Sequence, residues 1–331
     1  MKFSLFVHME RFAPSQTHAE LFEQLEELVL IAEAGGMETA WIGEHHCMEF
    51  TIAPNPFINI AHLGARTQRI RLGTGTVIAP FWHPLRLAGE AAMTDLATGG
   101  RLDLGIARGA YAFEYERLSP GLNAWDAGQK MREMVPLLPK LWEGDVTHEG
   151  EFWQFPKSTS VPKPAQKQIP LWIAARDPNS HAYAVANGCN VQVTPLASGD
   201  EEVKSLAQRF DDACKQHADV PRPEVMLLMH TYVGDSDTDT AQASREFSRF
   251  YCYFDSWFKN QRTITNGLIE NLSDEEMAEL PRYAPDVLKK NLVIGTPDEV
   301  IARLKSYEAM GYDQYSFWID RLMPFERKKA S

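Results

Sequence analysis

The stretch GTGTVIAP, residues 73–80, decides between the two folds that this chain allows. It ends an apolar run, residues 70–77, that is typical of a buried strand. A doubly wound, dinucleotide-binding sheet usually carries the loop GxGxxG at such a place, and that loop opens directly into a helix. Here two glycines are followed by β-branched residues, and no helix begins at once. A doubly wound sheet is therefore only the second choice.

Seven further runs of the same kind complete the pattern. Most are apolar throughout, as expected for parallel strands that are covered on both faces. The eight predicted strands are residues 3–7, 39–43, 70–77, 102–106, 171–174, 190–193, 225–233 and 314–319. Predicted helices lie between them, among them 19–34, 85–96 and 298–310. Eight strands that alternate with helices predict an α/β fold, a single (β/α)8 TIM barrel over residues 1–331.

Two segments exceed a minimal barrel. Residues 145–170 contain THEGEFWQFP and predict a short hairpin followed by a proline-rich loop. Residues 259–292 are long and acidic, and loops of this length are usually functional lids or disordered. A solvated surface helix is the alternative for DEEMAEL within that segment. We keep 259–292 as a candidate mobile lid or insertion.

Composition argues against several classes of partner. Lys and Arg total 33 against 45 Asp and Glu, a formal net charge of −12, whereas nucleic-acid binding needs clustered positive charge. The first residues lack the apolar segment of a signal peptide, and no run approaches a membrane span. We therefore expect a cytoplasmic protein with no membrane association. The four cysteines are far apart and form no CxxC pair, which makes zinc-finger and disulfide frameworks weak hypotheses.

The stretch AWIGEHHCMEF, residues 40–50, places an acid and two histidines after the second strand: Glu44, His45 and His46. In a barrel, ligand groups gather at the carboxyl ends of the strands. A neutral imidazole there can act as a general base. Neighbouring side chains in extended chain point opposite ways, so we expect one histidine to face the cavity. No metal site is predicted, and a histidine bonded to a nearby loop is the structural alternative.

Three other strand ends carry candidate ligand groups. Gly75 and Thr76 end the third strand, where glycines indicate close approach of a ligand or simple barrel packing. Arg108 in GIARGAY suits a phosphate or a carboxylate, and Gly109 beside it leaves backbone N–H groups accessible. A structural salt bridge is the alternative for Arg108.

The stretch WIAARDPNSHA, residues 172–182, ends the fifth strand and opens a helix, whose N-terminus attracts phosphate. Arg176 and Ser180 could add a charge and a hydroxyl, and Asp177 is predicted to cap the helix. Capping alone is the alternative. The aromatic stretch FSRFYCYFDSWF, residues 247–258, is more often core at helical spacing, but it would wall an apolar substrate site if it faced the barrel mouth.

Taken together, the chain resembles the bacterial luciferase family of flavin-dependent monooxygenases, which are (β/α)8 barrels. The resemblance rests on the stretches MKFSLF, WIGEHHCMEF, NPFINIAHLGA, LGTGTVIAPFWHPLR, GGRLDLGIARGAY and VIGTPDEVI. It covers nearly the whole chain and is most specific before Tyr111. The ordered occurrence of several motifs is strong support, whereas any one of them alone would be weak.

The resemblance implies a two-component enzyme. The family binds reduced FMN, which a separate flavin reductase supplies, and O2 adds to it to give a peroxyflavin that oxidises a small organic substrate. The substrate we expect is an aldehyde or ketone, and the aromatic stretch indicates an apolar one. His45 falls at the essential histidine of the family, and His46 at a neighbour with a more structural role.

The resemblance also implies roles around the flavin. Gly75 and Thr76 fall where the family has a cis peptide beneath the ring, and Glu114 matches an acid near it. Arg108 matches the arginine that binds the flavin phosphate, and it is followed by Gly109 and Ala110. Helices in the first half of the luciferase barrel pair two subunits.

The stretch that corresponds to those pairing helices is LRLAGEAAMTDLA, residues 85–97. It carries Ala88, Gly89, Ala91 and Ala92, small residues that permit close approach of helices, so a homodimer is expected. Packing of these residues on the barrel of their own subunit is the alternative.

Departures from luciferase leave its aldehyde pocket and light emission open. Ala107 replaces a reactive cysteine, and Arg176 and Asp177 stand where luciferase has an acid and a serine. Three other functions remain as alternatives. A relative could move hydride through a deazaflavin, or bind flavin without turnover, and an unrelated barrel could be a metal-dependent hydrolase.

Overall fold

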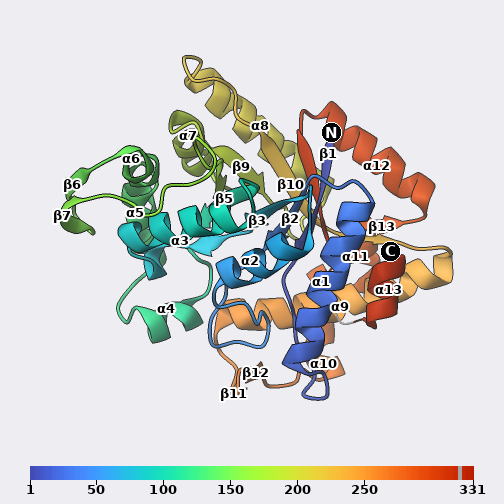
Figure 1. The fold of residues 1–331 in the computed structure, drawn as a ribbon. Coiled ribbons are helices and arrows are strands. Elements are labelled where there is room, and N and C mark those ends of the chain that lie inside the picture. The colour runs from blue at the N-terminus through green and yellow to red at the C-terminus, as the bar shows by residue number, and fades with distance from the viewer. Residues whose placement is uncertain (320–322) are drawn as a thin grey trace.

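A computed structural model describes residues 1–319 and 323–331. Within these residues, eight parallel strands pair in sequence order and the last pairs with the first, which closes a barrel (Figure 1). They are β1 (Lys2–Val7), β2 (Thr39–Ile42), β3 (Arg71–Thr74), β5 (Leu102–Ala107), β8 (Leu171–Ala174), β9 (Asn190–Val193), β10 (Val225–Val233) and β14 (Gln314–Trp318). The predicted TIM barrel and all eight predicted strands are confirmed. The predicted run 70–77 is divided at the cis peptide Gly75–Thr76 into β3 and the short β4 (Val77–Ile78).

Helices surround the barrel (Figure 1). They are α1 (His18–Ala34), α2 (Pro56–Arg66), α3 (Pro84–Ala97), α4 (Ala112–Leu118), α5 (Ala124–Met134), α6 (Leu137–Glu143), α7 (Pro178–Ala186), α8 (Asp200–Gln216), α9 (Asp237–Lys259), α10 (Asp274–Ala278), α11 (Pro285–Asn291), α12 (Pro297–Ala309) and α13 (Phe325–Ala330), with 3-10 turns η1 (Ala79–Phe81) and η2 (Pro281–Tyr283). The start of α12 is as predicted, because Thr296 and Glu299 form a reciprocal capping box around Pro297. None of the described helices is both long enough and apolar enough to cross a membrane.

The two segments beyond the minimal barrel have regular structure. Residues 145–170 contain the predicted hairpin, formed by β6 (Val146–Glu149) and β7 (Gln154–Ser158). Residues 259–292 contain a second small hairpin, β11 (Ile264–Thr265) and β12 (Leu268–Ile269), followed by α10, η2 and α11. The acidic helix α10 has no buried residue, which agrees with the surface-helix interpretation of DEEMAEL. A last short strand, β13 (Val293–Gly295), pairs with β10.

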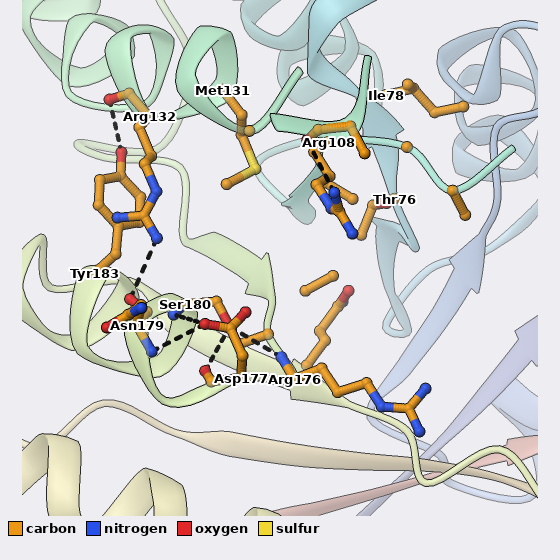
Figure 2. A pocket seen from close by; sticks show the side chains of 18 of the residues that line it. Thr76, Ile78, Arg108, Met131, Arg132, Arg176, Asp177, Asn179, Ser180 and Tyr183 are labelled. Carbon is orange, nitrogen blue, oxygen red and sulfur yellow. Dashed lines mark hydrogen bonds between the residues drawn. The ribbon is translucent and has the colours of Figure 1, made fainter. Parts of the chain in front are cut away.

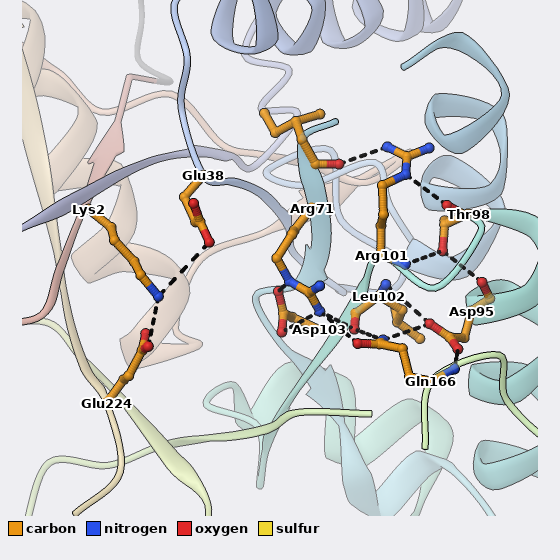
Figure 3. A network of polar contacts seen from close by, with 11 residues as sticks. Lys2, Glu38, Arg71, Asp95, Thr98, Arg101, Leu102, Asp103, Gln166 and Glu224 are labelled. Atoms are coloured by element: carbon orange, nitrogen blue, oxygen red, sulfur yellow. Dashed lines mark hydrogen bonds and ion pairs between the residues drawn. The ribbon is translucent and has the colours of Figure 1, made fainter. Parts of the chain in front are cut away.

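The two ends of the barrel differ in chemistry. The carboxyl ends of the strands surround a pocket (Figure 2), whereas a network of polar side chains lies at the amino ends (Figure 3). In that network Arg71 donates two hydrogen bonds, of 2.7 and 3.1 Å, to the buried carboxylate of Asp103. Burial raises the pKa of Asp103, and the Arg71 guanidinium opposes that rise. Gln166 donates to Asp95 and to the carbonyl of Leu102, which ties the segment 145–170 to the barrel.

Close packing inside the barrel depends on glycine at two strand positions. A methyl group on Gly73 would lie 2.2 Å from the ring of Trp41, which is fully buried. A methyl group on Gly105 would lie 2.1 Å from the backbone carbonyl oxygen of Thr74 on the neighbouring strand. The second contact is the stricter one, because a backbone oxygen cannot move aside as the end of a side chain can.

We predict that Gly105→Ala destabilises the fold more than most single substitutions. Overpacking a close-packed interior costs about 1–3 kcal/mol, and we expect the upper end of that range because the clash is with backbone. Urea denaturation followed by circular dichroism measures the free energy of unfolding. Gly144→Ala is the matched control, since nothing lies within 4 Å of a methyl group there. Equal stability of the two variants would contradict this account of the packing.

Candidate functional site

The pocket at the carboxyl ends of the strands has a volume of about 1150 Å³. It brings together nine of the predicted residues from four strand ends: Glu44, His45, Gly75, Thr76, Arg108, Gly109, Ala110, Arg176 and Ser180. His46 and Glu114 lie behind this lining and contact its members. A ligand in the pocket would therefore touch residues that are more than 130 positions apart in the chain.

His45 is held by Glu114 from α4. The Nδ1 atom of His45 lies 3.0 Å from Oε2 of Glu114, whose side chain is 1% exposed. The other carboxylate oxygen accepts a hydrogen bond of 2.7 Å from the backbone N–H of His46. Because a carboxylate only accepts hydrogen bonds, Nδ1 carries the proton, and Nε2 is left as the nitrogen that can take one up.

Glu44 holds the same loop from its other side. Its buried carboxylate accepts hydrogen bonds from the backbone N–H of Ile78 at 2.8 Å and from the indole of Trp82 at 2.9 Å. The Nε2 atom of His46 lies 2.7 Å from the same carboxylate. His45 thus lines the pocket while His46 turns to Glu44, as expected for neighbouring residues in extended chain. These contacts favour a positioning role for Glu44 and His46.

A second imidazole lies next to His45. The rings of His8 and His45 are perpendicular, with centroids 5.1 Å apart. His8 is buried, and it is within hydrogen-bond distance of Thr51 at 2.9 Å and of Glu10 at 3.1 Å. Burial lowers the pKa of His8 well below its usual value, and the neighbouring His45 lowers it further. His8 is therefore uncharged at neutral pH.

Arginines gather at the other end of the pocket. Figure 2 shows Arg108 and Arg132 reaching it from one side and Arg176 from the opposite side. Arg108 donates to the carbonyl of Ala124 at 2.8 Å, which leaves most of its guanidinium donors available. Arg132 lies over the ring of Tyr183, 4.7 Å from its centroid. Guanidinium groups arranged in this way suit a phosphate, which accepts several charge-assisted hydrogen bonds.

The N-terminus of α7 is already capped. Asp177 accepts hydrogen bonds from the backbone N–H groups of Asn179 and Ser180, at 3.0 and 3.1 Å. Partial burial would raise the pKa of Asp177, but hydrogen bonds from Ser180 and Asn179 outweigh it and lower the pKa. The Ser180 hydroxyl donates to the carbonyl of Asp177 and accepts from the backbone of Arg176. The capping alternative thus describes these atoms, and anion binding falls mainly to the arginines.

Two polar residues of the lining, Arg132 and Gln192, were not singled out from the sequence, whereas Phe258 lies in the aromatic stretch that was. The Gln192 side chain is 7% exposed, and among the described residues its Nε2 has no hydrogen-bond partner. A glutamine between two valines of strand β9 is a signal that could have identified it. Phe258 is the last aromatic of the stretch 247–258, most of which is core, as expected. Arg132 lies in α5 without any local motif that marks it.

None of the described residues forms a group of three or more His, Cys, Asp or Glu side chains that could hold a metal ion.

Comparison with known proteins gives a specific match. A family model described as luciferase-like monooxygenase matches residues 1–314.

The oxygenase component of a flavin-dependent trigonelline monooxygenase from Acinetobacter baylyi is 62% identical over 332 residues, covering 100% of this chain and 92% of that protein. The crystal structure of the monooxygenase RslO1 from Streptomyces bottropensis has a TM-score of 0.82 at 26% identity, covering 100% and 96% of the two chains. The oxygenating constituent of a Pseudomonas putida 3,6-diketocamphane monooxygenase, solved with FMN, has a TM-score of 0.76 at 19% identity, covering 99% and 96%. The last likeness shows the fold alone.

We predict that Glu114→Ala changes the tautomer of His45. Without the carboxylate, Nδ1–H loses its acceptor, so Nε2–H should become the main neutral form in nitrogen-15 NMR spectra of the ring. The variant should also lose about 1–3 kcal/mol of stability, because the backbone N–H of His46 is left without its partner. Glu116→Ala, at an exposed position of the same helix, is the control. An unchanged His45 signal in Glu114→Ala would show that the carboxylate does not set the tautomer.

Proposed function

The chain belongs to the luciferase-like monooxygenase family, and from this premise we propose that it is the oxygenase component of a two-component monooxygenase. It would use reduced FMN and O2 to oxidise a small organic substrate, with a separate flavin reductase as its partner. The observation that carries the proposal is one pocket with the His45–Glu114 pair at one end and three arginines at the other. The relative at 62% identity supports it, since its name describes a flavin-dependent oxygenase component.

The residues present fit a flavin mononucleotide. Its phosphate needs cationic donors, and Arg108, Arg132 and Arg176 lie in the same pocket. Its ring has several acceptor atoms on its polar edge, and the amide of Gln192 is a buried donor without a partner among the described residues. Gly109 also lines the pocket, and a side chain is excluded there because φ is +90° and a methyl group would lie 2.8 Å from Ile78. The same residues suit a deazaflavin, so the titration described below compares the two cofactors.

When bound, a reduced flavin supplies the electrons that activate O2 for insertion of one oxygen atom into the substrate. The protein contributes a proton carrier and a fixed geometry. His45 can take up or return a proton at Nε2, because Glu114 holds its other nitrogen. Glu44 keeps the loop in place through Ile78 and Trp82, so the imidazole cannot turn away from the pocket. The paired base argues against a role in flavin binding without turnover.

The segment 259–292 is well placed to act as a lid. It begins directly after Phe258, which lines the pocket. The tip of its hairpin accepts a hydrogen bond at the carbonyl of Gly267 from the backbone N–H of Glu49, at 2.8 Å. Glu49 belongs to the loop that carries His45. We therefore infer that this segment closes the pocket and excludes water during the reaction.

The substrate is proposed from the relative. Trigonelline is a pyridine ring with a methylated, positively charged nitrogen and a carboxylate. At 62% identity over the whole chain, a small N-methylated heterocycle of this kind is the first substrate to test. The aldehyde or ketone expected from the luciferase resemblance stays a second candidate substrate.

A homodimer remains a proposal, but we place its interface on other residues than the small residues of α3. Ala88, Ala91 and Ala92 are all 0% exposed within one subunit, so they pack on their own barrel. The adjacent helices α2 and α3 instead expose larger apolar side chains, with Ile58 65% and Met93 58% exposed. Leu96 on α3 is also exposed. Large exposed apolar side chains on two adjacent helices are typical of an interaction surface.

We predict that the double variant Ile58→Glu, Met93→Glu is monomeric. Two carboxylates in an apolar interface would be desolvated without partners. Light scattering during size-exclusion chromatography at micromolar concentration should give a dimer mass for the unaltered protein and half of it for the variant. Ile31→Glu, which alters an exposed isoleucine on α1, should leave the mass unchanged. A monomer mass for the unaltered protein would refute the dimer.

We predict that His45→Ala still binds reduced FMN but loses most of its oxygenation. Loss of a general acid–base group lowers the rate about 10²–10⁴-fold, whereas the phosphate contacts at the other end are untouched. Anaerobic fluorescence titration measures flavin binding, and mass spectrometry of the product measures oxygenation with a reductase present. Unchanged turnover would remove His45 from the mechanism. If a reduced deazaflavin bound more tightly than reduced FMN in the same titration, the hydride-transfer alternative would take the place of this proposal.

A further inference from the structure

Gln192 presents an unpaired amide to the pocket. The residue lies in β9, lines the pocket and is 7% exposed. Within residues 1–319 and 323–331, no group forms a hydrogen bond with its Nε2 atom. Burying a polar group without a partner costs free energy, so a buried amide that borders a ligand pocket indicates a ligand atom that pairs with it.

The amide of Gln192 reaches inward from β9 as far as β5. A methyl group on Gly105 would lie 3.1 Å from Nε2 and 3.2 Å from Oε1 of Gln192, so the amide rests against this glycine. The polar groups beside it are paired with each other. The Thr74 hydroxyl donates to the carbonyl of Gly105 at 2.7 Å and accepts from its N–H at 2.8 Å. These groups therefore leave the amide to a ligand.

Gln192 and His45 reach the pocket from opposite sides of the barrel. His45 follows β2, and the path around the barrel from β2 to β9 passes β3, β5 and β8 in one direction and β1, β14 and β10 in the other. Gln192 also lies deeper than the arginines, since the Arg176 side chain is 53% exposed. A cofactor whose phosphate contacts the arginines and whose ring approaches His45 therefore meets Gln192 with its ring.

One edge of a reduced flavin ring matches a primary amide. N5–H is a donor and the neighbouring O4 is an acceptor, while the amide offers an acceptor oxygen beside a donor nitrogen. Glutamine makes the same two-bond pairing with N6 and N7 of adenine, which are likewise a donor and an acceptor at adjacent positions of a flat ring. A 5-deazaflavin has carbon in place of N5, so it keeps only the bond to O4.

We propose that Gln192 selects a flavin over a 5-deazaflavin, by accepting a hydrogen bond from N5–H of the reduced ring at Oε1 and donating one to O4 from Nε2. This inference rests on the proposed monooxygenase function and specifies how the same site recognises its cofactor. The arginines cannot make this distinction, because both kinds of cofactor carry a phosphate. Packing against Gly105 alone is the alternative role for Gln192.

The test compares reduced FMN with reduced 5-deaza-FMN, a synthetic analogue that differs only at position 5 of the ring. Isothermal titration calorimetry of the unaltered protein, without oxygen, measures both dissociation constants. The constant for reduced FMN should be about tenfold lower, as expected for one additional hydrogen bond. Equal constants would overturn the inference without the need for any variant.

A pair of variants locates the effect. Gln192→Leu removes the amide at similar volume, so both ligands should bind more weakly and the preference for reduced FMN should disappear. Gln129→Leu makes the same change at a partly exposed glutamine of α5 that also lines the pocket, and it should keep the preference. A preference that persists in Gln192→Leu would mean that another group recognises position 5, and would also overturn the inference.

The two proposals fail in distinguishable ways. If the protein binds both reduced cofactors equally and still oxygenates a substrate with reduced FMN, the monooxygenase function stands and the role of Gln192 falls. If reduced FMN does not bind, the proposed function itself is wrong.

Discussion

Two glycines on the neighbouring strands β3 and β5 allow the close packing of the barrel wall and its interior. Gly105 packs against the carbonyl of Thr74, and Gly73 packs against the indole of Trp41. Trp41 is fully buried and lies against Gly75, which lines the pocket. The Trp41 side chain therefore fills the barrel interior directly behind the strand end that lines the pocket.

In the pocket itself, hydrogen bonds from charged side chains fix the positions of the site residues. The loop that carries His45 is held by two glutamates that reach it from different elements, Glu44 from within the loop and Glu114 from α4. Arg108 and Arg176 follow strands β5 and β8, Arg132 lies in α5, and all three line the pocket. The pocket therefore combines guanidinium groups with an imidazole–carboxylate pair in one otherwise largely apolar lining.

Patterns that are local in the sequence predicted most of the fold and part of the site. Eight apolar runs predicted eight strands correctly, because a parallel strand that is covered on both faces is apolar along its whole length. The sequence TPDE predicted the start of α12, because a capping box depends on only four residues. Strand ends placed His45 and Arg108 together once a barrel was assumed. The position of Arg132 over Tyr183 depends on tertiary contacts, which no short stretch encodes. Gln192, in contrast, carried a local signal that the analysis of the sequence overlooked. The direction in which Ala88 and its neighbours face could not be read from their size either.

The contrast between His45 and Phe258 has a consequence for how such a site can diverge. His45 is cross-bonded to Glu114, and His46 joins both glutamates, so a change at any of these positions disturbs the others. Phe258 stands at the end of α9, half exposed, and makes only ring contacts. A side chain at the rim can thus be exchanged singly, whereas the residues of the His45 loop can change only together.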